Sequence, residues 1–312
     1  MLKKFYPTCN TNSNHIIQII IKNDKLYNVF SKLHNLKLFD VSLRDGLQNV
    51  KGDINIYTTE MKLNLYKEIV NKYNPKYIEV GSLVSPKILP IFNDSLELFK
   101  KTQKENNTSN FLLIPSFEKI KYAMNAHCFN ISLIASVSEE FQLKNTKKNL
   151  LETRNDITNT VHYFISDMAV EKPKIKIYLS CIDTCPIKGK IHINKILDEI
   201  RYYYMICRPY ILCLSDTTGT LEPDVLKEIL EGCFKMGISN KIISLHLHVN
   251  AKTEEKVIQN IHIALDRNIT GFDVSILASG GCSVTIDKNI NANLSYQLFY
   301  KALYYYLEKR IN

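Results

Sequence analysis

Arg44, Asp45 and Gly46 stand together at the end of an apolar run, residues 36–41, and are the residues best suited to chemistry in this chain. A guanidinium presents a rigid fork of donors that can clamp an anionic oxygen. A carboxylate offers hard oxygen to a divalent cation, and glycine lets the backbone turn sharply or approach a ligand. An ordinary strand-to-loop turn with an ion pair would need the same residues, so function depends on partners elsewhere: Glu79, Asp216, His246, His248, Cys282 and Asn293.

His246 and His248 are two residues apart in the apolar run 242–248. Alternate residues of a strand point to the same face, so two imidazoles can meet one metal ion there. Each could instead be a core histidine with a satisfied hydrogen bond. An aspartate at the same rim favours a metal site with open positions for water or a chelating substrate, which suits Mg²⁺ or Mn²⁺ as a Lewis acid. Structural zinc would need closed, thiolate-rich ligation.

Cys282 follows two glycines, Gly280 and Gly281, after the last expected strand. A thiol on such a turn at a catalytic rim predicts a proton donor or acceptor. The other cysteines lack zinc-ribbon spacing, since Cys181 and Cys185 have no second pair. Several lie in apolar runs, where cysteine behaves as a small hydrophobe. A reducing compartment is therefore expected.

The elements that would position these residues form a repeating pattern. Short apolar runs, most of them rich in β-branched or aromatic residues, predict buried strands at 36–41, 77–82, 110–115, 129–136, 174–181, 211–216, 242–248 and 271–276. Amphipathic stretches predict helices at 59–73, 87–103, 146–168, 190–206, 221–236, 252–267 and 292–310, and the segment between the third and fourth strands is short for a helix.

Strand followed by helix, repeated along the chain, predicts an α/β fold of the (β/α)₈ TIM-barrel class. An open, doubly wound sheet is the rival fold, but it would want a Gly-rich turn after its first strand, where this chain has Arg44-Asp45-Gly46. Active sites of TIM barrels lie at the carboxyl ends of the strands. The polar residues named above fall at or near those ends.

Residues 1–35 lie outside this pattern and are expected to form an N-terminal extension to a catalytic barrel of residues 36–312. Within it, Ile16–Ile21 could form a strand and Leu26–Leu33 a short helix that cap the bottom of the barrel. The first 23 residues contain no Asp, Glu or Arg, which favours a cytoplasmic extension over an organellar presequence, with mitochondrial targeting left open. The apolar runs are far too short to cross a membrane.

The formal net charge is +9, but the lysines are scattered over the expected helix faces. A nucleic-acid binder would gather them in a stripe with interleaved aromatics, so no nucleic-acid partner is expected. A modest positive excess favours a polyanionic ligand such as a coenzyme with phosphates.

The motifs together resemble the 3-hydroxy-3-methylglutaryl-CoA lyase family, within the metal-dependent Claisen and aldol-type barrel enzymes. The resemblance is carried by RDGLQN (44–49), IEVGSLVSPK (78–87), SCIDTCPIKGK (180–190), SDTTG (215–219), HLH (246–248), GGC (280–282) and Asn293-Leu294. Leu47, after Arg-Asp-Gly, is typical of the lyase branch, because the related condensing synthases usually carry Glu-Gln there.

This resemblance implies a divalent cation, Mg²⁺ or Mn²⁺, bound by Asp45, His246, His248 and Asn293. It implies that Arg44 neutralises the thioester enolate, that Cys282 transfers a proton, and that Arg44 and Gln48 contact the substrate. Glu79 and Asp216 would position the ligands or act in acid–base chemistry. The implied reaction cleaves 3-hydroxy-3-methylglutaryl-CoA to acetoacetate and acetyl-CoA. The partner would be an acyl-CoA, and a homodimer is allowed.

Three departures from the family pattern leave alternatives open. Val249 replaces an Asp, Gln297 replaces an acidic residue, and the loop after Cys282 lacks the usual Pro and Gly and is two residues longer. With that insertion the amide ligand is Asn293, whose following leucine fits the family; without it, the ligand is Asn291. The alternatives are a related aldolase or synthase with another acyl-CoA or 2-oxo acid, and a catalytically impaired barrel that binds acyl-CoA.

Overall fold

The computed structural model describes residues 16, 18–20, 22–31, 33, 36–49, 57–103, 108–166, 173–281 and 292–311. Cys282 and Asn291 lie outside these residues. So do the first fifteen residues and most of the loop that follows Cys282.

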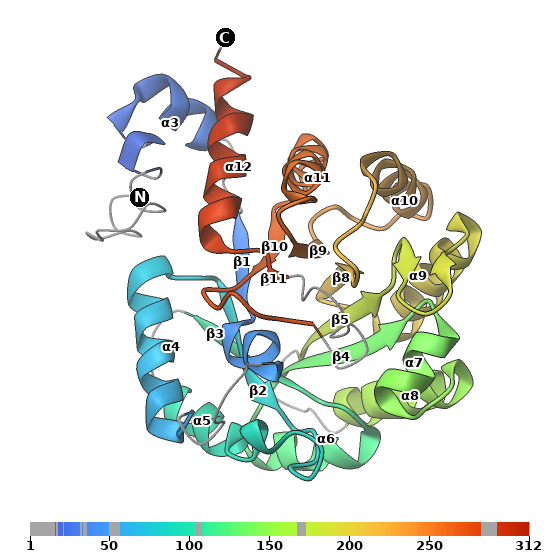
Figure 1. Ribbon diagram of the computed structural model, residues 1–312. Helices are drawn as coiled ribbons and strands as arrows, with labels where there is room; N and C mark the ends of the chain where they lie inside the picture. The colour runs from blue at the N-terminus through green and yellow to red at the C-terminus, as the bar shows by residue number, and fades with distance from the viewer. Residues whose placement is uncertain are drawn as a thin grey trace.

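Eight parallel strands of the described chain close into a barrel. They are β1 (Lys37–Asp40), β2 (Tyr77–Ser82), β3 (Ser109–Leu113), β4 (Asn130–Ser136), β5 (Lys174–Ser180), β8 (Ile211–Asp216), β9 (Ile243–Val249) and β10 (Gly271–Val274). Closure is complete because β10 pairs in parallel with both β1 and β9. Figure 1 looks along the barrel, with the helices arranged around it. The predicted TIM barrel is therefore confirmed, and each predicted strand overlaps an observed one.

Helices surround the sheet in the predicted alternation. They are α4 (Thr59–Tyr73), α5 (Ser95–Thr102), α6 (Phe117–Asn125), α7 (Glu139–Thr146), α8 (Leu150–Ser166), α9 (Ile193–Cys207), α10 (Pro223–Lys235), α11 (Glu254–Asp266) and α12 (Tyr296–Glu308). Three predicted helices have wrong bounds. The stretch 292–310 starts with a short strand, Ala292–Asn293, and becomes helical only at Tyr296. The stretch 87–103 contains a short 3₁₀ turn, Pro90–Phe92, before α5, and 146–168 begins only at Leu150. Lys147 adopts a left-handed conformation that ends α7 and separates it from α8.

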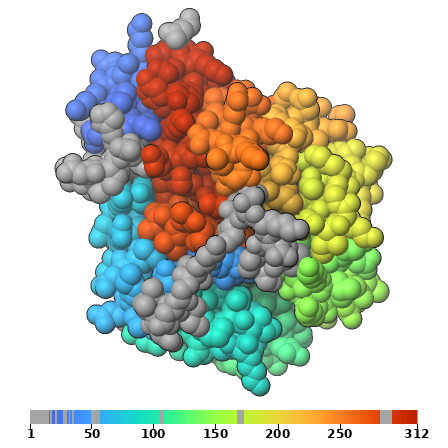
Figure 2. Space-filling model, viewed as in Figure 1, coloured from blue at the N-terminus to red at the C-terminus, as the bar shows by residue number. Residues whose placement is uncertain are grey.

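The N-terminal segment differs from its prediction. Ile16 and residues 18–20 are helical, so a strand at Ile16–Ile21 is wrong, and a helix α3 (Asp24–Ser31) follows. A helix satisfies its own backbone groups, so this segment needs no strand partner from the barrel. Helix α3 packs beside α12, outside the ring of helices (Figure 1). In the space-filling view of Figure 2, these early and late segments adjoin along one side of the molecule.

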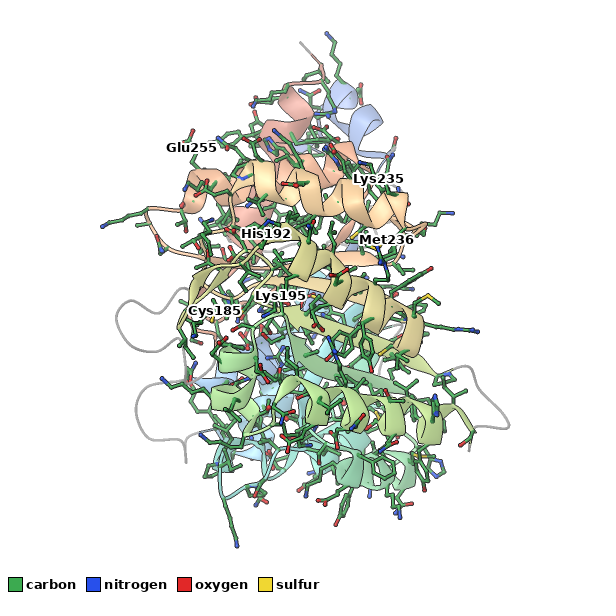
Figure 3. The ribbon with its side chains drawn as sticks, turned by 90° about the vertical axis from the view of Figure 1, so that its right-hand side faces the viewer. Cys185, His192, Lys195, Lys235, Met236 and Glu255 are labelled. Carbon is green, nitrogen blue, oxygen red and sulfur yellow. The ribbon has the colours of Figure 1, made fainter. Side chains whose placement is uncertain are left out.

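The barrel interior is filled by side chains at alternate strand positions. An aromatic cluster fills the part of the interior farther from the carboxyl ends of the strands, with Phe39, Tyr77 and Phe111 in mutual contact. Figure 3 views the barrel from the side, with Cys185, His192 and Glu255 toward one end and Lys235 and Met236 toward the other. Cys185 follows the end of β5, so the carboxyl ends of the strands lie on its side. No helix of the described residues is both long and apolar enough to cross a membrane.

Candidate active site

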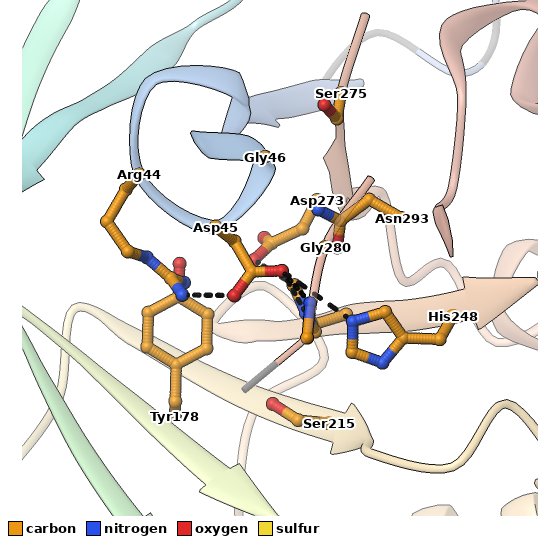
Figure 4. A network of polar contacts seen from close by, with 12 residues as sticks. Arg44, Asp45, Gly46, Tyr178, Ser215, His248, Asp273, Ser275, Gly280 and Asn293 are labelled. Atoms are coloured by element: carbon orange, nitrogen blue, oxygen red, sulfur yellow. Dashed lines mark hydrogen bonds and ion pairs between the residues drawn. The ribbon is translucent and has the colours of Figure 1, made fainter. Parts of the chain in front are cut away.

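The segment Ser42–Gly46 forms a single π-helical turn directly after β1, and every residue in it is buried. The Gly46 N–H donates to the carbonyl of Val41 over 3.0 Å. π-turns of this kind are frequent at functional sites. A Cβ on Gly46 would lie 3.0 Å from Ser275 Oγ and 3.2 Å from Leu277 Cδ1, so a side chain here would require these neighbours after β10 to shift by a few tenths of an ångström. Arg44 and Asp45 project from this turn into the mouth of the barrel (Figure 4).

The guanidinium of Arg44 is clamped from two sides. Nε donates to Glu79 Oε2, and Nη1 donates to Asp45 Oδ1 over 2.5 Å. Tyr178 supports the assembly, because its hydroxyl donates to the same Glu79 oxygen over 3.1 Å and its ring centroid lies 5.0 Å from Arg44 Cζ. Burial lowers the pKa of Arg44, but Glu79 and Asp45 more than offset this, so the pKa is raised well above its usual value. The side chain is a permanent, oriented cation.

Asp45 meets both predicted histidines on its other side. Its Oδ2 lies 3.9 Å from His246 Nε2 and 3.6 Å from His248 Nε2. The ligand atoms of these three buried residues all lie within 4.8 Å of one another. His246 lies 201 positions after Asp45 in the chain, and the structure brings the two side chains together.

Two buried atoms at this place have no hydrogen-bond partner among the described residues: His248 Nε2 and Asn293 Oδ1. Asn293 lies in β11 (Ala292–Asn293), which pairs antiparallel with β9 so that Asn293 is opposite His248. Figure 4 shows Asn293 and His248 on the side of Asp45 away from Arg44. Buried polar atoms without partners are costly, and a shared cation would satisfy both. One carboxylate, two imidazoles and one amide oxygen fit a divalent cation that keeps open positions.

The electrostatics favour the cation-binding forms of two of the three clustered residues, Asp45 and His246. Burial raises the pKa of Asp45, but Arg44 and His248 outweigh it and hold the pKa well below its usual range, so the group is a carboxylate. Burial lowers the pKa of His246, which favours the neutral imidazole that a metal needs. Burial also acts to lower the pKa of His248, yet Asp45 and Asp216 raise it overall. These two groups therefore favour the protonated imidazole at His248, the form that competes with a cation.

Both imidazoles are oriented through Nδ1. His246 Nδ1 lies 3.1 Å from Asp273 Oδ2, and His248 Nδ1 lies 3.0 Å from the main-chain carbonyl oxygen of Asp216. The carboxylate of Asp216 itself accepts the N–H groups of Thr220 over 3.1 Å and Leu221 over 3.0 Å. Asp216 thus supports His248 through its backbone and closes the turn before α10 with its side chain. Acid–base chemistry by its carboxylate stays a prediction.

The segment after β10 is fastened to the π-turn. Gly281 N–H donates to Asp45 Oδ2 over 2.9 Å, and Asn49 Nδ2 donates to the Gly281 carbonyl. A Cβ on Gly280 would lie 2.3 Å from Asn293 Nδ2, so only glycine leaves room for that amide. Cys282 lies outside the described residues, but its neighbour Gly281 lines the site pocket.

A pocket of about 60 Å³ opens above these residues. Predicted residues supply part of its lining: Arg44, Asp45, Gln48, His246 and His248. Other lining residues were not foreseen from the sequence: Ile134, Phe141, Asn145, Tyr178, Ser180, Ser215 and Thr217. Tyr178 could have been predicted from the sequence, because it lies two positions before Ser180, at the end of β5, and so shares its strand face. Glu79 lies behind Arg44 rather than in the lining.

The fold and the site together define a class of protein: a TIM barrel whose carboxyl-end rim holds a buried Asp–His–His cluster beside a clamped arginine. Such a cluster has the donor set and spacing of a metal centre. The chain belongs to the HMGL-like family, whose family model matches residues 35–282. This confirms the resemblance inferred from the motifs, and membership identifies the chain as a lyase.

The chain is similar to the hydroxymethylglutaryl-CoA lyase of Macaca fascicularis, named as mitochondrial, with 29% identity over 248 residues, 79% of this chain and 72% of the relative. The lyase of Pseudomonas mevalonii is 27% identical over 250 residues, covering 79% and 78% of the two chains. An HMG-CoA lyase from Acinetobacter baumannii, solved with coenzyme A and 3-methylmalate, has a TM-score of 0.73 at 24% identity, covering 85% of this chain and 81% of that one. This structural likeness supports the fold.

Proposed function

We propose that this protein cleaves 3-hydroxy-3-methylglutaryl-CoA to acetoacetate and acetyl-CoA with the help of a divalent cation. One observation carries the proposal. A single buried turn presents Arg44 to one side and Asp45 to the paired histidines on the other, at the mouth of one pocket. Cleavage of a β-hydroxy thioester needs both functions side by side, because charge develops on the thioester oxygen while the hydroxyl loses its proton.

The cation would be held by Asp45, His246, His248 and Asn293, with Asn293 preferred over Asn291 because its Oδ1 is buried and unpaired. When bound, it would polarise the tertiary hydroxyl and the terminal carboxylate of the substrate as a Lewis acid. Carboxylate and amide oxygens with imidazole suit Mg²⁺ or Mn²⁺, and the absence of thiolates from the described cluster argues against structural zinc.

Arg44 would stabilise the charge that forms on the thioester. The bond between the α-carbon and the hydroxyl-bearing carbon breaks, its electron pair moves to the thioester as an enolate, and the hydroxyl carbon becomes the ketone of acetoacetate. The hydroxyl proton leaves to a base, and the enolate carbon gains a proton to give acetyl-CoA. A fixed guanidinium in a buried site stabilises an enolate without reorganising. Cys282 would take part in the proton transfer.

The remaining predicted residues would act on these two centres. Glu79 would hold Arg44 in place together with Tyr178, and Asp216 would hold His248. Gln48 lines the pocket and would contact the acyl-CoA. The phosphate-bearing coenzyme would suit the positive net charge of +9. The cytoplasmic location and a homodimer stay predictions.

The test is a product assay with purified protein, Mg²⁺ or Mn²⁺, and hydroxymethylglutaryl-CoA, measuring acetoacetate and acetyl-CoA. Arg44→Gln should lower kcat by roughly 10²- to 10³-fold, as removal of an oxyanion-stabilising donor does. Arg154→Gln is the matched control, because this arginine pairs with Glu199 between the outer helices α8 and α9. Wild-type protein that forms no metal-dependent acetoacetate would refute the proposal.

A different outcome would favour the alternatives. Val249 pairs with Ala292 and places no acidic group beside His248. If the protein cleaves or condenses another acyl-CoA, or binds coenzyme A without turnover, the lyase reaction is not its own.

A further inference from the structure

Lys176 is a charged residue in the middle of the barrel interior. It lies in β5, and none of its surface is exposed. Its Nζ is 2.7 Å from each carboxylate oxygen of Asp273 in β10. The ammonium also lies 3.3 Å from the ring centroid of Phe39 and 4.2 Å from that of Tyr178. Removing such a pair from water costs more than a packed apolar pair would, so its presence is weak evidence for a role in stability.

Asp273 connects this pair to the candidate metal site. Its Oδ2 lies 3.1 Å from His246 Nδ1. A carboxylate held at both oxygens by an ammonium can only accept a hydrogen bond, so Nδ1 carries the proton and donates it. That tautomer leaves the lone pair on Nε2, the atom that faces Asp45 Oδ2 across 3.9 Å.

His248 is oriented by a different device. Its Nδ1 faces the main-chain carbonyl oxygen of Asp216, which accepts a hydrogen bond and cannot be removed by substitution. Of the two imidazoles, His246 is therefore the one whose tautomer and ring direction depend on a side chain. Figure 4 shows Asp273 below the π-turn, next to Asp45.

We propose that Asp273, fixed by Lys176, is a positioning residue that sets the cation affinity of this site by aiming His246 Nε2 at Asp45. The two contacts of Lys176 with Asp273 prevent the carboxylate from rotating, and the carboxylate prevents the imidazole ring from flipping. A ring held in the ligating orientation before the cation arrives loses no rotational freedom when it binds. The inference rests on the metal site of the proposed function.

The experiment is a Mn²⁺ titration of the full-length protein after chelation, with free Mn²⁺ followed by electron paramagnetic resonance. Asp273→Ala removes the acceptor and should weaken Mn²⁺ binding by roughly 10- to 100-fold, the usual effect of losing such a partner. The double variant Lys176→Met/Asp273→Asn keeps an amide oxygen for Nδ1–H without the ion pair, and should bind Mn²⁺ more tightly than Asp273→Ala but less tightly than wild type, because the amide is no longer held against rotation.

Lys62→Met is the matched control for loss of a buried lysine. Lys62 Nζ lies 2.6 Å from Asp94 Oδ1, and its side chain is 4% exposed, but it belongs to α4 on the outside of the barrel. This variant should lose stability and keep its Mn²⁺ affinity. Circular dichroism verifies that each variant is folded.

The outcomes separate the inference from the function it rests on. If wild-type protein binds no Mn²⁺, the metal site and the inference both fail. If wild type binds and Asp273→Ala binds equally well, the inference alone is wrong. The inference is also wrong if the double variant loses as much Mn²⁺ affinity as Asp273→Ala, because the acceptor for His246 Nδ1–H would then not determine the affinity.

Discussion

At the scale of single residues, Asp45 joins the parts of the site. Its Oδ1 accepts from Arg44, and its Oδ2 accepts from Gly281 N–H and faces both histidines. One carboxylate therefore aligns the guanidinium, the segment leading to Cys282 and the candidate ligands. A change in the position of any one of these groups would therefore change the positions of the others.

Gly280 offers a test of Asn293 as a ligand. The Cβ of Gly280→Ala would lie 2.6 Å from Asn293 Cγ, so the amide must move. We expect Mn²⁺ affinity to fall by about 10-fold or more, the scale seen when a ligand is misplaced. Because both changes act on one contact, Gly280→Ala/Asn293→Ala should be no weaker than Asn293→Ala alone. A Mn²⁺ titration measures this.

Gly237→Ala is the control for backbone strain, because φ is positive at both glycines, +155° at Gly280 and +76° at Gly237, and nothing lies within 4 Å of a Cβ added to Gly237. Its neighbour Met236 lies at the opposite end of the barrel (Figure 3). Unchanged Mn²⁺ affinity in Gly280→Ala would mean that Asn293 is not a ligand.

At the scale of elements, Asp40 joins four pieces of backbone around the π-turn. At the end of β1, it accepts Ser42 N–H over 2.8 Å and the Tyr296 hydroxyl, at the start of α12, over 2.9 Å. Ser42 Oγ donates to the same carboxylate and accepts Ile276 N–H after β10 over 2.9 Å. Burial raises the pKa of Asp40 to about 7 despite these bonds, and Asp273 adds to the shift.

This shift predicts a pH dependence of stability. The folded pKa lies above the unfolded one, so the folded state binds the proton more tightly. The stabilisation is complete below the unfolded pKa and is lost as the pH rises through the folded value near 7. At about 1.4 kcal/mol per pKa unit, the shift from 3.8 to about 7 amounts to roughly 4 kcal/mol, of which roughly 3 kcal/mol is lost between pH 5 and pH 8. Urea unfolding near pH 5 and pH 8 should show the loss in wild type and not in Asp40→Asn.

The comparison of the two proteins cancels the titration of other groups. If wild type and Asp40→Asn change stability equally between the two pH values, Asp40 does not hold its proton in the folded state.

At the scale of the whole molecule, closure of the barrel creates the site. β10 pairs with β1 and with β9, which places the turn after β1 beside the histidines of β9. A cation bound by these distant segments would link the two ends of the barrel sequence. Its binding should therefore stabilise the entire fold rather than one loop.

A thermal unfolding experiment tests this linkage. Mn²⁺ at 100 times its Kd should add about 2.7 kcal/mol, which corresponds to a rise in Tm of roughly 5 °C for a chain of this size. EDTA should reverse the rise, and His248→Ala should abolish it. His192→Ala should keep the rise, because this histidine caps α9 through Asn194 N–H and is not in the cluster. An equal rise in His248→Ala would place the cation elsewhere.

The sequence by itself determined the barrel, because the order of apolar runs and amphipathic stretches is a local property of the chain. β-branched runs favour strands, and the alternation admits few folds. It also predicted Asp45, His246 and His248 as neighbours, since the carboxyl ends of parallel strands meet at one rim. It predicted the wrong element at Ile16–Ile21, because a short apolar run is compatible with a strand and with a buried helix segment.

Only the tertiary structure decided how the site is held. The π-turn that aims Arg44 and Asp45, the room that Gly280 leaves for Asn293, and the line from Lys176 through Asp273 to His246 depend on the register between strands far apart in sequence. Register decides which inward side chains share a level of the barrel. No local pattern encodes it, because the contacts of Gly280 with Asn293 and of Lys176 with Asp273 exist only once β10 has closed the ring.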